Sequence, residues 1–143
     1  MKKVNLILLV LFIFSFSKDV LAEWKKITTN LNGDSFYIDL NKIEKNNELV
    51  KFWVLIDSSK KASSKRSGIK SVKTQQQCEC ESSKYKTITW SFYSLQMGKG
   101  KSTDKSDFYA DHFMSSNYWT YPSPKSSEEK VIKIVCEKVK NNQ

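Results

Sequence analysis

The sequence predicts an α+β fold in which an antiparallel β-sheet meander is followed by one C-terminal α-helix. Two patterns carry this prediction: several short segments alternate apolar and polar residues, and a final segment repeats its apolar residues with helical spacing. The chain has 143 residues, a length typical of a single domain. Its 39% hydrophobic and 13% aromatic content is too high for a disordered chain, so we expect a folded core.

The first 22 residues are predicted to be an export signal that is cleaved. Lys2 and Lys3 precede an apolar run over residues 4–16, and residues 20–22 (Val-Leu-Ala) place short side chains before the expected cut. The alternative is an uncleaved membrane anchor, but the run is shorter than the roughly 20 apolar residues that span a bilayer. We therefore expect a single mature domain over residues 23–143. No cysteine follows the apolar run, so no lipid anchor is expected.

Three strands are predicted in the first part of this domain. Residues 24–29 form a short strand, and Asn32-Gly33 predicts a hairpin turn in which both central positions have positive φ. Residues 35–40 alternate in polarity, which is typical of a half-buried strand. The polar residues after them predict a turn, with one helical turn around Ile43. The segment 49–56 is apolar on both faces, so we place it centrally in the sheet.

The next two predicted strands are more polar. Residues 69–81 are extended but polar, so we expect this strand nearer an edge of the sheet. Residues 85–95 alternate again, which places Ile88 and Trp90 on one face and Thr87 on the other. The glycines that follow supply the backbone freedom to end this strand.

The last element is predicted to be an amphipathic helix. It follows a short aromatic strand or packed loop at residues 118–121. Ser126 and Glu129 fit a capping box, with Ser126 as N-cap. Apolar residues then recur at i, i+3, i+4 and i+7 along one helix face, at Ile132, Val135, Cys136 and Val139. This apolar face has to be buried, so we expect the helix to pack against the predicted sheet.

Three cysteines indicate one disulfide and one remaining thiol, because an exported protein folds in an oxidising compartment. Cys78 and Cys80 are separated by one residue and are a poor pair with each other. Cys136 is therefore the long-range partner of one of them. A disulfide from Cys136 to Cys78 or Cys80 closes a long loop of the chain. Closing such a loop stabilises the fold by about 4 kcal/mol in the chain-entropy model.

No catalytic, metal or cofactor site is predicted. The only histidine, His112, excludes a multi-histidine metal centre, and it lies in a segment where a solvated loop residue is expected. The chain has four glycines and no nucleophile elbow. Asp104, Asp107 and Asp111 lack the spacing and the closing glutamate of an EF-hand loop.

Six aromatic residues either line a ligand cleft between helix and sheet or form the core itself. They are Phe52, Trp53, Trp90, Phe92, Trp119 and Tyr121.

A basic patch is the candidate partner-binding surface. The chain carries 24 basic and 15 acidic side chains, and its densest basic cluster falls in and after an exposed Ser/Lys-rich loop at residues 57–68. The patch consists of Lys60, Lys61, Lys65, Arg66 and Lys70. Such a surface suits anionic lipid headgroups or sulfated polysaccharide, or it is simply a solvated face. No nucleic-acid partner is expected, because no aromatic residues interleave with these charges and only one basic residue is an arginine.

The whole mature chain resembles the surface-adhesin protein E-like domain family of Gram-negative bacteria. The resemblance is carried by the order and spacing of several short segments rather than by one motif. These segments are Trp24–Ile27, Gly33–Asp39, Phe52–Asp57, Cys80–Lys86, Tyr93, Met97–Gly100, Trp119–Pro124, Ser126–Ser127 and Val135–Cys136. The family implies a curved antiparallel sheet, a helix laid across it and a disulfide between helix and sheet. The family's sheet cysteine precedes a basic-aromatic-basic triplet, which matches Cys80 and implies a Cys80–Cys136 bridge.

The resemblance also implies a function without catalysis. We expect an exported envelope or surface protein that recognises a macromolecular or polyanionic partner, in the periplasm or on the outer surface of a Gram-negative cell. The alternative is a soluble periplasmic protein that holds a small ligand under the helix. A free sheet face or edge also permits a homodimer. Cys78 departs from the family pattern, as an addition to the usual pair.

Overall fold

The computed structural model describes residues 23–59, 68–103 and 118–141, which form one sheet and a C-terminal helix. The predicted signal peptide lies outside these residues. The elements are β1 (Trp24–Thr29), β2 (Ser35–Asp39), β3 (Glu44–Asn46), β4 (Leu49–Asp57), β5 (Ser71–Glu79), β6 (Lys84–Tyr93), the 3-10 turn η1 (Gln96–Gly98), β7 (Ser102–Thr103) and α4 (Ser127–Asn141).

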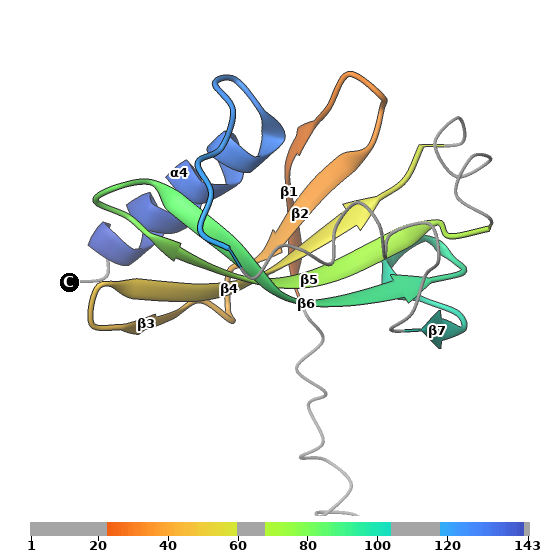
Figure 1. The fold of residues 1–143 in the computed structure, drawn as a ribbon. Coiled ribbons are helices and arrows are strands. Elements are labelled where there is room, and N and C mark those ends of the chain that lie inside the picture. Colours follow the sequence, from red (N-terminus) through yellow and green to blue (C-terminus); the bar gives the residue numbers. More distant parts are fainter. Residues whose placement is uncertain (1–22, 60–67, 104–117, 142–143) are drawn as a thin grey trace, which may run out of the picture.

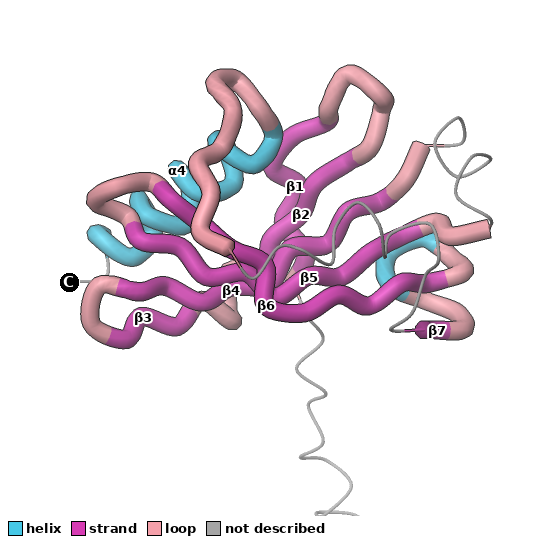
Figure 2. The backbone as a smooth tube through the Cα atoms, in the orientation of Figure 1, coloured by secondary structure: helices cyan, strands magenta, loops and turns pink. Residues whose placement is uncertain are grey.

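Every strand pair in the sheet is antiparallel. The strand order is β1-β2-β4-β5-β6-β7, and β2 and β3 pair with opposite ends of the long strand β4. Figure 1 shows the strongly twisted sheet with α4 lying across one face of it. Figure 2 shows the same helix as the long cyan segment beside the strands. The predicted α+β fold, a curved antiparallel meander with a helix on one face, is confirmed.

The β1–β2 hairpin closes through a wider loop than the sequence predicts. Gly33 has a φ of 84°, but Asn32 does not have positive φ, so the prediction of a two-residue turn is wrong. The side-chain Oδ1 of Asn30 accepts hydrogen bonds from the backbone N–H groups of Asn32 (3.0 Å) and Asp34 (2.9 Å). These bonds hold a longer turn, as asparagine side chains commonly do.

The predicted helical turn around Ile43 is also wrong. Residues 44–46 form the short strand β3, which pairs with β4 as Asn46 faces Leu49. Asn47 adopts a φ of 55° at the tip of this second hairpin. Asparagine tolerates this left-handed conformation better than most residues, so the chain reverses within two residues instead of starting a helix.

The polar strand β5 is central, although its composition predicts a position nearer an edge. It lies between β4 and β6. Thr74 and Gln76 are buried on its inner face, where they lie opposite Val54 and Phe52 of β4. Apolar residues of the neighbouring strands therefore cover polar side chains of β5, and the polarity of one strand does not reveal its place in the sheet.

A β-bulge in β6 changes which residues share a face. Trp90 is paired with Thr74 and Thr87 with Gln76, so Ile88 is the extra residue of the bulge. Thr87 therefore faces the same side as Trp90, and the prediction that it lies on the opposite face is wrong. The bulge therefore sets residues from both sides of Ile88 on the same face of the sheet.

The main core lies between α4 and the inner face of the sheet. Its buried members are Phe36, Ile38, Val50, Phe52, Val54, Cys78, Val131, Ile132, Val135 and Cys136. The predicted helix cap is confirmed, since Ser126 Oγ accepts a hydrogen bond from the N–H of Glu129 at 3.1 Å. Glu129 in turn accepts one from the N–H of Lys125 at 2.6 Å, one residue before the expected donor. Among the described residues, no helix is both long enough and apolar enough to span a membrane.

Candidate functional site

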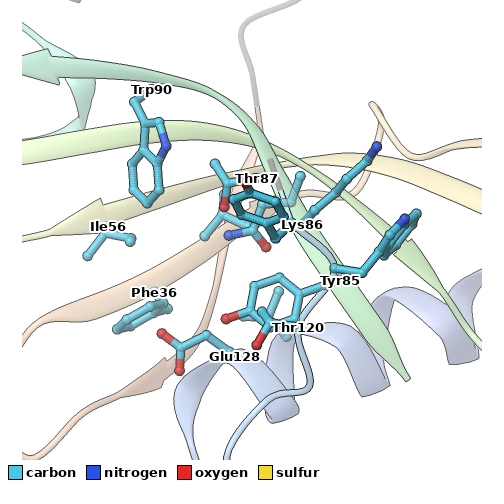
Figure 3. Close-up of a pocket in the computed structure, with 13 residues that line it drawn as sticks. Phe36, Ile56, Tyr85, Lys86, Thr87, Trp90, Thr120 and Glu128 are labelled. Carbon is cyan, nitrogen blue, oxygen red and sulfur yellow. The ribbon is translucent and has the colours of Figure 1, made fainter. Parts of the chain in front are cut away.

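A cleft of about 420 Å³ opens between the inner face of the sheet, the start of α4 and the segment after residue 117. Figure 3 shows residues from all three parts facing this space. The lining residues are Phe36, Val54, Ile56, Gln76, Tyr85, Lys86, Thr87, Trp90, Tyr118, Trp119, Thr120, Glu128 and Val131.

The apolar wall of the cleft follows from strand register. Phe36 of β2 faces Ile56 of β4, and the bulge in β6 sets Trp90 and Thr87 on the same side of the sheet. Figure 3 shows Phe36, Ile56 and Trp90 grouped at one end of the cleft. This wall can hold an apolar group out of water.

The opposite wall is built by a short bridge between distant parts of the chain. The N–H of Tyr85 donates to the carbonyl of Thr120 at 2.8 Å, and the N–H of Thr120 donates back at 2.9 Å. This pair fixes the segment that carries Tyr118 and Trp119 against the edge of β6. The side chain of Glu128, from the first turn of α4, lies below Tyr85 in Figure 3.

Aromatic and lysine side chains lie at the cleft or next to the residues that line it, and we call them the aromatic–lysine rim. Tyr118, Tyr121 and Trp119 are exposed by 76%, 69% and 38%. The Nζ atoms of Lys84 and Lys86 lie 5.3 and 5.0 Å from the centroid of the Trp119 ring, within cation–π range. The rim therefore consists of Lys84, Lys86, Tyr118, Trp119 and Tyr121.

The charges at the rim are partly paired. Lys84 Nζ lies 2.8 Å from Glu79 Oε2, and Ser82 also donates to this carboxylate. The hydrogen bond from Lys84 lowers the pKa of Glu79, with a smaller contribution from Ser82. The same bond raises the pKa of Lys84. Lys86 has no such carboxylate partner among the ion pairs of the described residues.

Tyr85 is a hydrogen-bonding group and not a base. Burial raises its pKa to about 12, and the negative charge of Glu128 adds to the shift. The hydroxyl therefore stays protonated at neutral pH and can donate a hydrogen bond into the cleft.

The predicted basic patch is only partly described. Lys70 is exposed just before β5, where its backbone groups bond to Ser58 and Tyr93. Lys60, Lys61, Lys65 and Arg66 lie outside the described residues, and so does His112. The patch therefore stays a prediction.

The six aromatic residues fall into different environments. Phe52 is in the main core, and Phe92 packs with Val72 in a second small cluster. Trp90 and Trp119 line the cleft, Tyr121 is exposed and Trp53 lies on the outer face of the sheet. Tyr85, Lys86 and Tyr118 were not predicted as site residues, because the sequence does not reveal which strand the aromatic residues 118–121 pair with.

The structure joins Cys80 to Cys136, with 5.6 Å between their Cα atoms, and leaves the buried Cys78 as a free thiol. This bridge ties α4 to the end of β5, as the family resemblance implies. In the described part of the chain, these three cysteines are the only cluster with the spacing of metal ligands. Two of the three sulfurs are bonded to each other, so this state offers a metal one thiol.

The fold and the site together define a class of protein: a single curved sheet, tied by a disulfide to one helix, with a cleft beside the helix and no catalytic constellation among the described residues. The family model for Surface-adhesin protein E matches residues 24–137. The chain belongs to this family, which is one of adhesins and not of enzymes. The resemblance seen in the sequence is thereby confirmed.

Solved structures of protein E from Haemophilus influenzae share the fold. Crystal form II aligns with a TM-score of 0.57 at 17% identity, covering 83% of this chain and 91% of that one. The selenomethionine form aligns with a TM-score of 0.59 at 16% identity, covering 83% and 89%. A third structure gives 0.57 at 18% identity, covering 83% and 87%. No curated protein matches the chain.

Proposed function

We propose that this protein is an exported, non-catalytic binding protein that recognises a macromolecular, polyanionic partner. Membership of the surface-adhesin protein E family supports a role in binding at or beyond the cell envelope. The signal-like residues 1–22 support export, with residues 23–143 as the mature domain. The contact surface proposed is the aromatic–lysine rim, together with the basic patch.

The observation that carries this proposal is the exposure of the rim. Tyr118 and Tyr121 present most of their surface to solvent, beside the lysine pair at Trp119. Exposed aromatic residues held by a backbone bridge lose little conformational freedom on binding, which is why such residues dominate binding surfaces. The lysines add attraction for negative charge, which weakens as salt is added.

The first test uses immobilised heparin as a sulfated polysaccharide probe. A rim variant, Trp119→Ala with Lys86→Glu, should weaken heparin binding at least tenfold, measured by surface plasmon resonance at two salt concentrations. Lys133→Glu is the matched control, because it makes the same charge change on the exposed side of α4. Equal losses in both variants would mean that net charge alone drives binding, and the rim proposal would then be wrong.

The basic patch is tested in the same way. Lys60→Glu with Lys61→Glu should weaken heparin binding, whereas Lys133→Glu with Lys138→Glu makes the same total charge change on α4. Unchanged binding in the patch variant would remove the patch from the binding surface and leave the rim alone.

The cleft supports a second candidate, a small ligand held under the start of α4. Its volume of about 420 Å³ lies within the usual range of ligand pockets, and Phe36, Ile56 and Trp90 give it an apolar wall. A ligand that binds only the folded protein raises its melting temperature. A library of small anionic and apolar compounds should contain one that raises the melting temperature of the wild type but not of Trp90→Ala. If no compound does so at saturation, the cleft is not a small-ligand site.

A further inference from the structure

Three sulfur atoms meet where the end of β5 contacts the middle of α4. Cys80 and Cys136 form the disulfide, and the free thiol of Cys78 is fully buried beside it. The Sγ of Cys78 lies 3.9 Å from the Sγ of Cys136, and all three sulfurs lie within 4.8 Å of one another. The extra cysteine therefore touches the bridge and is not an isolated core residue.

We propose that Cys78, Cys80 and Cys136 form a thiol–disulfide exchange centre, in which either strand cysteine can bridge Cys136 and Cys80 becomes a surface thiol open to modification. In the exchange, the thiolate of Cys78 attacks the Sγ of Cys136 and forms the Cys78–Cys136 bond. The Cys80–Cys136 bond breaks, and its electron pair leaves on the Sγ of Cys80. Cys80 then takes up one proton in place of the one that Cys78 lost, so no oxidant or reductant is consumed.

The short distance between the sulfurs, and the closeness of Cys78 and Cys80 in the sequence, favour the second bridge. The 3.9 Å gap has to close to the normal bond length of about 2.05 Å, which side-chain rotation can provide. Cys78 and Cys80 are two residues apart, so exchange moves the anchor point of α4 along the chain by two residues only. The helix stays covalently tied to the sheet in both isomers.

The resting state is nevertheless the Cys80–Cys136 isomer. The three sulfurs form a compact triangle, whereas exchange passes through a nearly linear row of three sulfurs, so the side chains have to rotate first. Burial raises the pKa of Cys78 to about 12, which leaves little of its thiolate at neutral pH. Exchange is therefore slow in the folded protein and needs a local opening of the contact between α4 and β5.

The two isomers differ in what they expose. Cys78 is fully buried on the inner face of β5, whereas Cys80 is half-buried in the turn between β5 and β6, next to the exposed Glu81. Exchange thus replaces an inaccessible thiol with an accessible one. A low-molecular-weight disulfide can then form a mixed disulfide with the Sγ of Cys80 and release one equivalent of its own thiol.

The first test asks whether the second bridge forms. Cys80→Ala, folded under oxidising conditions, should carry a Cys78–Cys136 bridge and no free thiol, by alkylation in denaturant and by non-reducing peptide mapping. Cys78→Ala is the matched control and should keep Cys80–Cys136, also with no free thiol. A folded Cys80→Ala protein with two free thiols would overturn the proposal.

The second test uses proteins that both keep the native bridge, so it decides the matter even if Cys80→Ala fails to fold. The mature protein is incubated with oxidised glutathione under native conditions. The wild type should gain one glutathione on Cys80 together with a Cys78–Cys136 bridge, and Cys78→Ala should gain none. An adduct on Cys78, an equal adduct in Cys78→Ala, or no adduct in the wild type would each show that the exchange centre does not operate.

Discussion

Thr74 carries a hydroxyl group into the interior of the molecule without a hydrogen-bond partner. Its side chain is fully buried, between Val54 of β4 and Trp90 of β6, and its Oγ1 has no partner among the described residues. Burying an unsatisfied polar group costs about 1–3 kcal/mol. This residue is therefore a local weakness in the centre of the sheet.

Replacing Thr74 with valine removes that cost while keeping the shape and the β-branched side chain. Thr74→Val should raise the free energy of unfolding by about 1 kcal/mol, measured by urea denaturation. Thr89→Val is the control, since Thr89 is exposed and its substitution should change stability much less. A loss of stability in Thr74→Val would show that the hydroxyl has a partner after all.

Asp57 is a second residue whose burial has a measurable cost. It ends β4 in a buried position, and its Oδ1 accepts a hydrogen bond from the N–H of Met97 at 2.6 Å. Burial raises the pKa of Asp57, and the hydrogen bond from Met97 offsets only part of that rise. The folded protein therefore holds the Asp57 proton more tightly than the unfolded chain does.

This difference predicts the direction of a pH effect. Because the pKa of Asp57 is raised in the folded state, its contribution to stability is present at low pH and is lost as the pH rises through that pKa. Asp57→Asn cannot titrate but can still accept the bond from Met97. The free energy of unfolding of the wild type, relative to Asp57→Asn, should therefore increase as the pH falls from 7 towards 4. A relative decrease over this range would contradict the assigned cause.

At the scale of an element, η1 is held by hydrogen bonds against the outer face of the sheet. Its backbone N–H groups donate to Asp57 and, from Gly98, to the Oγ of Ser71 at 2.9 Å. Lys73 passes beneath this turn, and its Nζ lies 5.7 and 5.0 Å from the ring centroids of Trp24 and Tyr93. The turn, the lysine and the two rings therefore pack as one unit.

Gly98 is where this packing is tightest. A Cβ on Gly98 would overlap Cε of Lys73, and the φ of Gly98 is +65°. A Cβ there displaces only the flexible end of Lys73 and not backbone, so Gly98→Ala should lower the free energy of unfolding slightly more than Gly68→Ala, because Gly68 also has positive φ (+83°) but has open space around its Cβ position. Alanine is strained at positive φ in both variants, by about 1 kcal/mol, so the difference between them measures the cost of moving the Lys73 side chain away from the Trp24 and Tyr93 rings.

Lys73→Ala supplies the check on this interpretation. In the Lys73→Ala background, Gly98→Ala and Gly68→Ala should cost about the same, because the atoms that clash are gone. If the difference persists there, the cost of Gly98→Ala comes from somewhere other than Lys73.

At the scale of the whole molecule, the sequence was sufficient for the longer strands, for the helix and for the fold class, but not for the short strand β3 or for the place of β5 in the sheet. Alternation located most strands, and the spacing of Ile132, Val135 and Val139 located the helix and its buried face. The position of β5 could not be predicted, because Gln76 and Thr74 are covered by residues of other strands. The bulge at Ile88 could not be predicted either, since a single extra residue leaves the pattern of the strand almost unchanged.

From the sequence, the aromatic residues could be assigned either to a ligand cleft or to the core, and the cleft was therefore only one of two predictions. The aromatic residues around it were recognised, but their division between core and cleft depends on contacts between distant parts of the chain. The bridge between Tyr85 and Thr120 decides that Trp119 lies at the mouth of the cleft. No local pattern specifies a pairing across 35 residues, and this is why Lys86 was not anticipated as part of the site.

The proposed export predicts where the protein meets proteases in a living cell. Protease treatment of intact producing cells should cleave the mature chain while a periplasmic control protein survives, if the partner is outside the cell. Protection until the outer membrane is permeabilised would place the protein in the periplasm and would favour the small-ligand candidate. Immunoblotting with an antibody against the C-terminal helix follows the intact chain and every fragment that retains this helix.

The bridge between Cys80 and Cys136 also determines what such an experiment can see. The two cysteines are 56 residues apart, and the rim residues Tyr118, Trp119 and Tyr121 all lie between them. A single cut anywhere in this interval leaves the two pieces covalently joined, so the nicked chain still migrates as one species until it is reduced. A cut in the basic loop before Gly68 instead leaves β1–β4 attached by non-covalent contacts alone. Comparing reduced with non-reduced gels thus tells on which side of Cys80 the chain was cut, and a molecule cut within the aromatic–lysine rim stays in one piece.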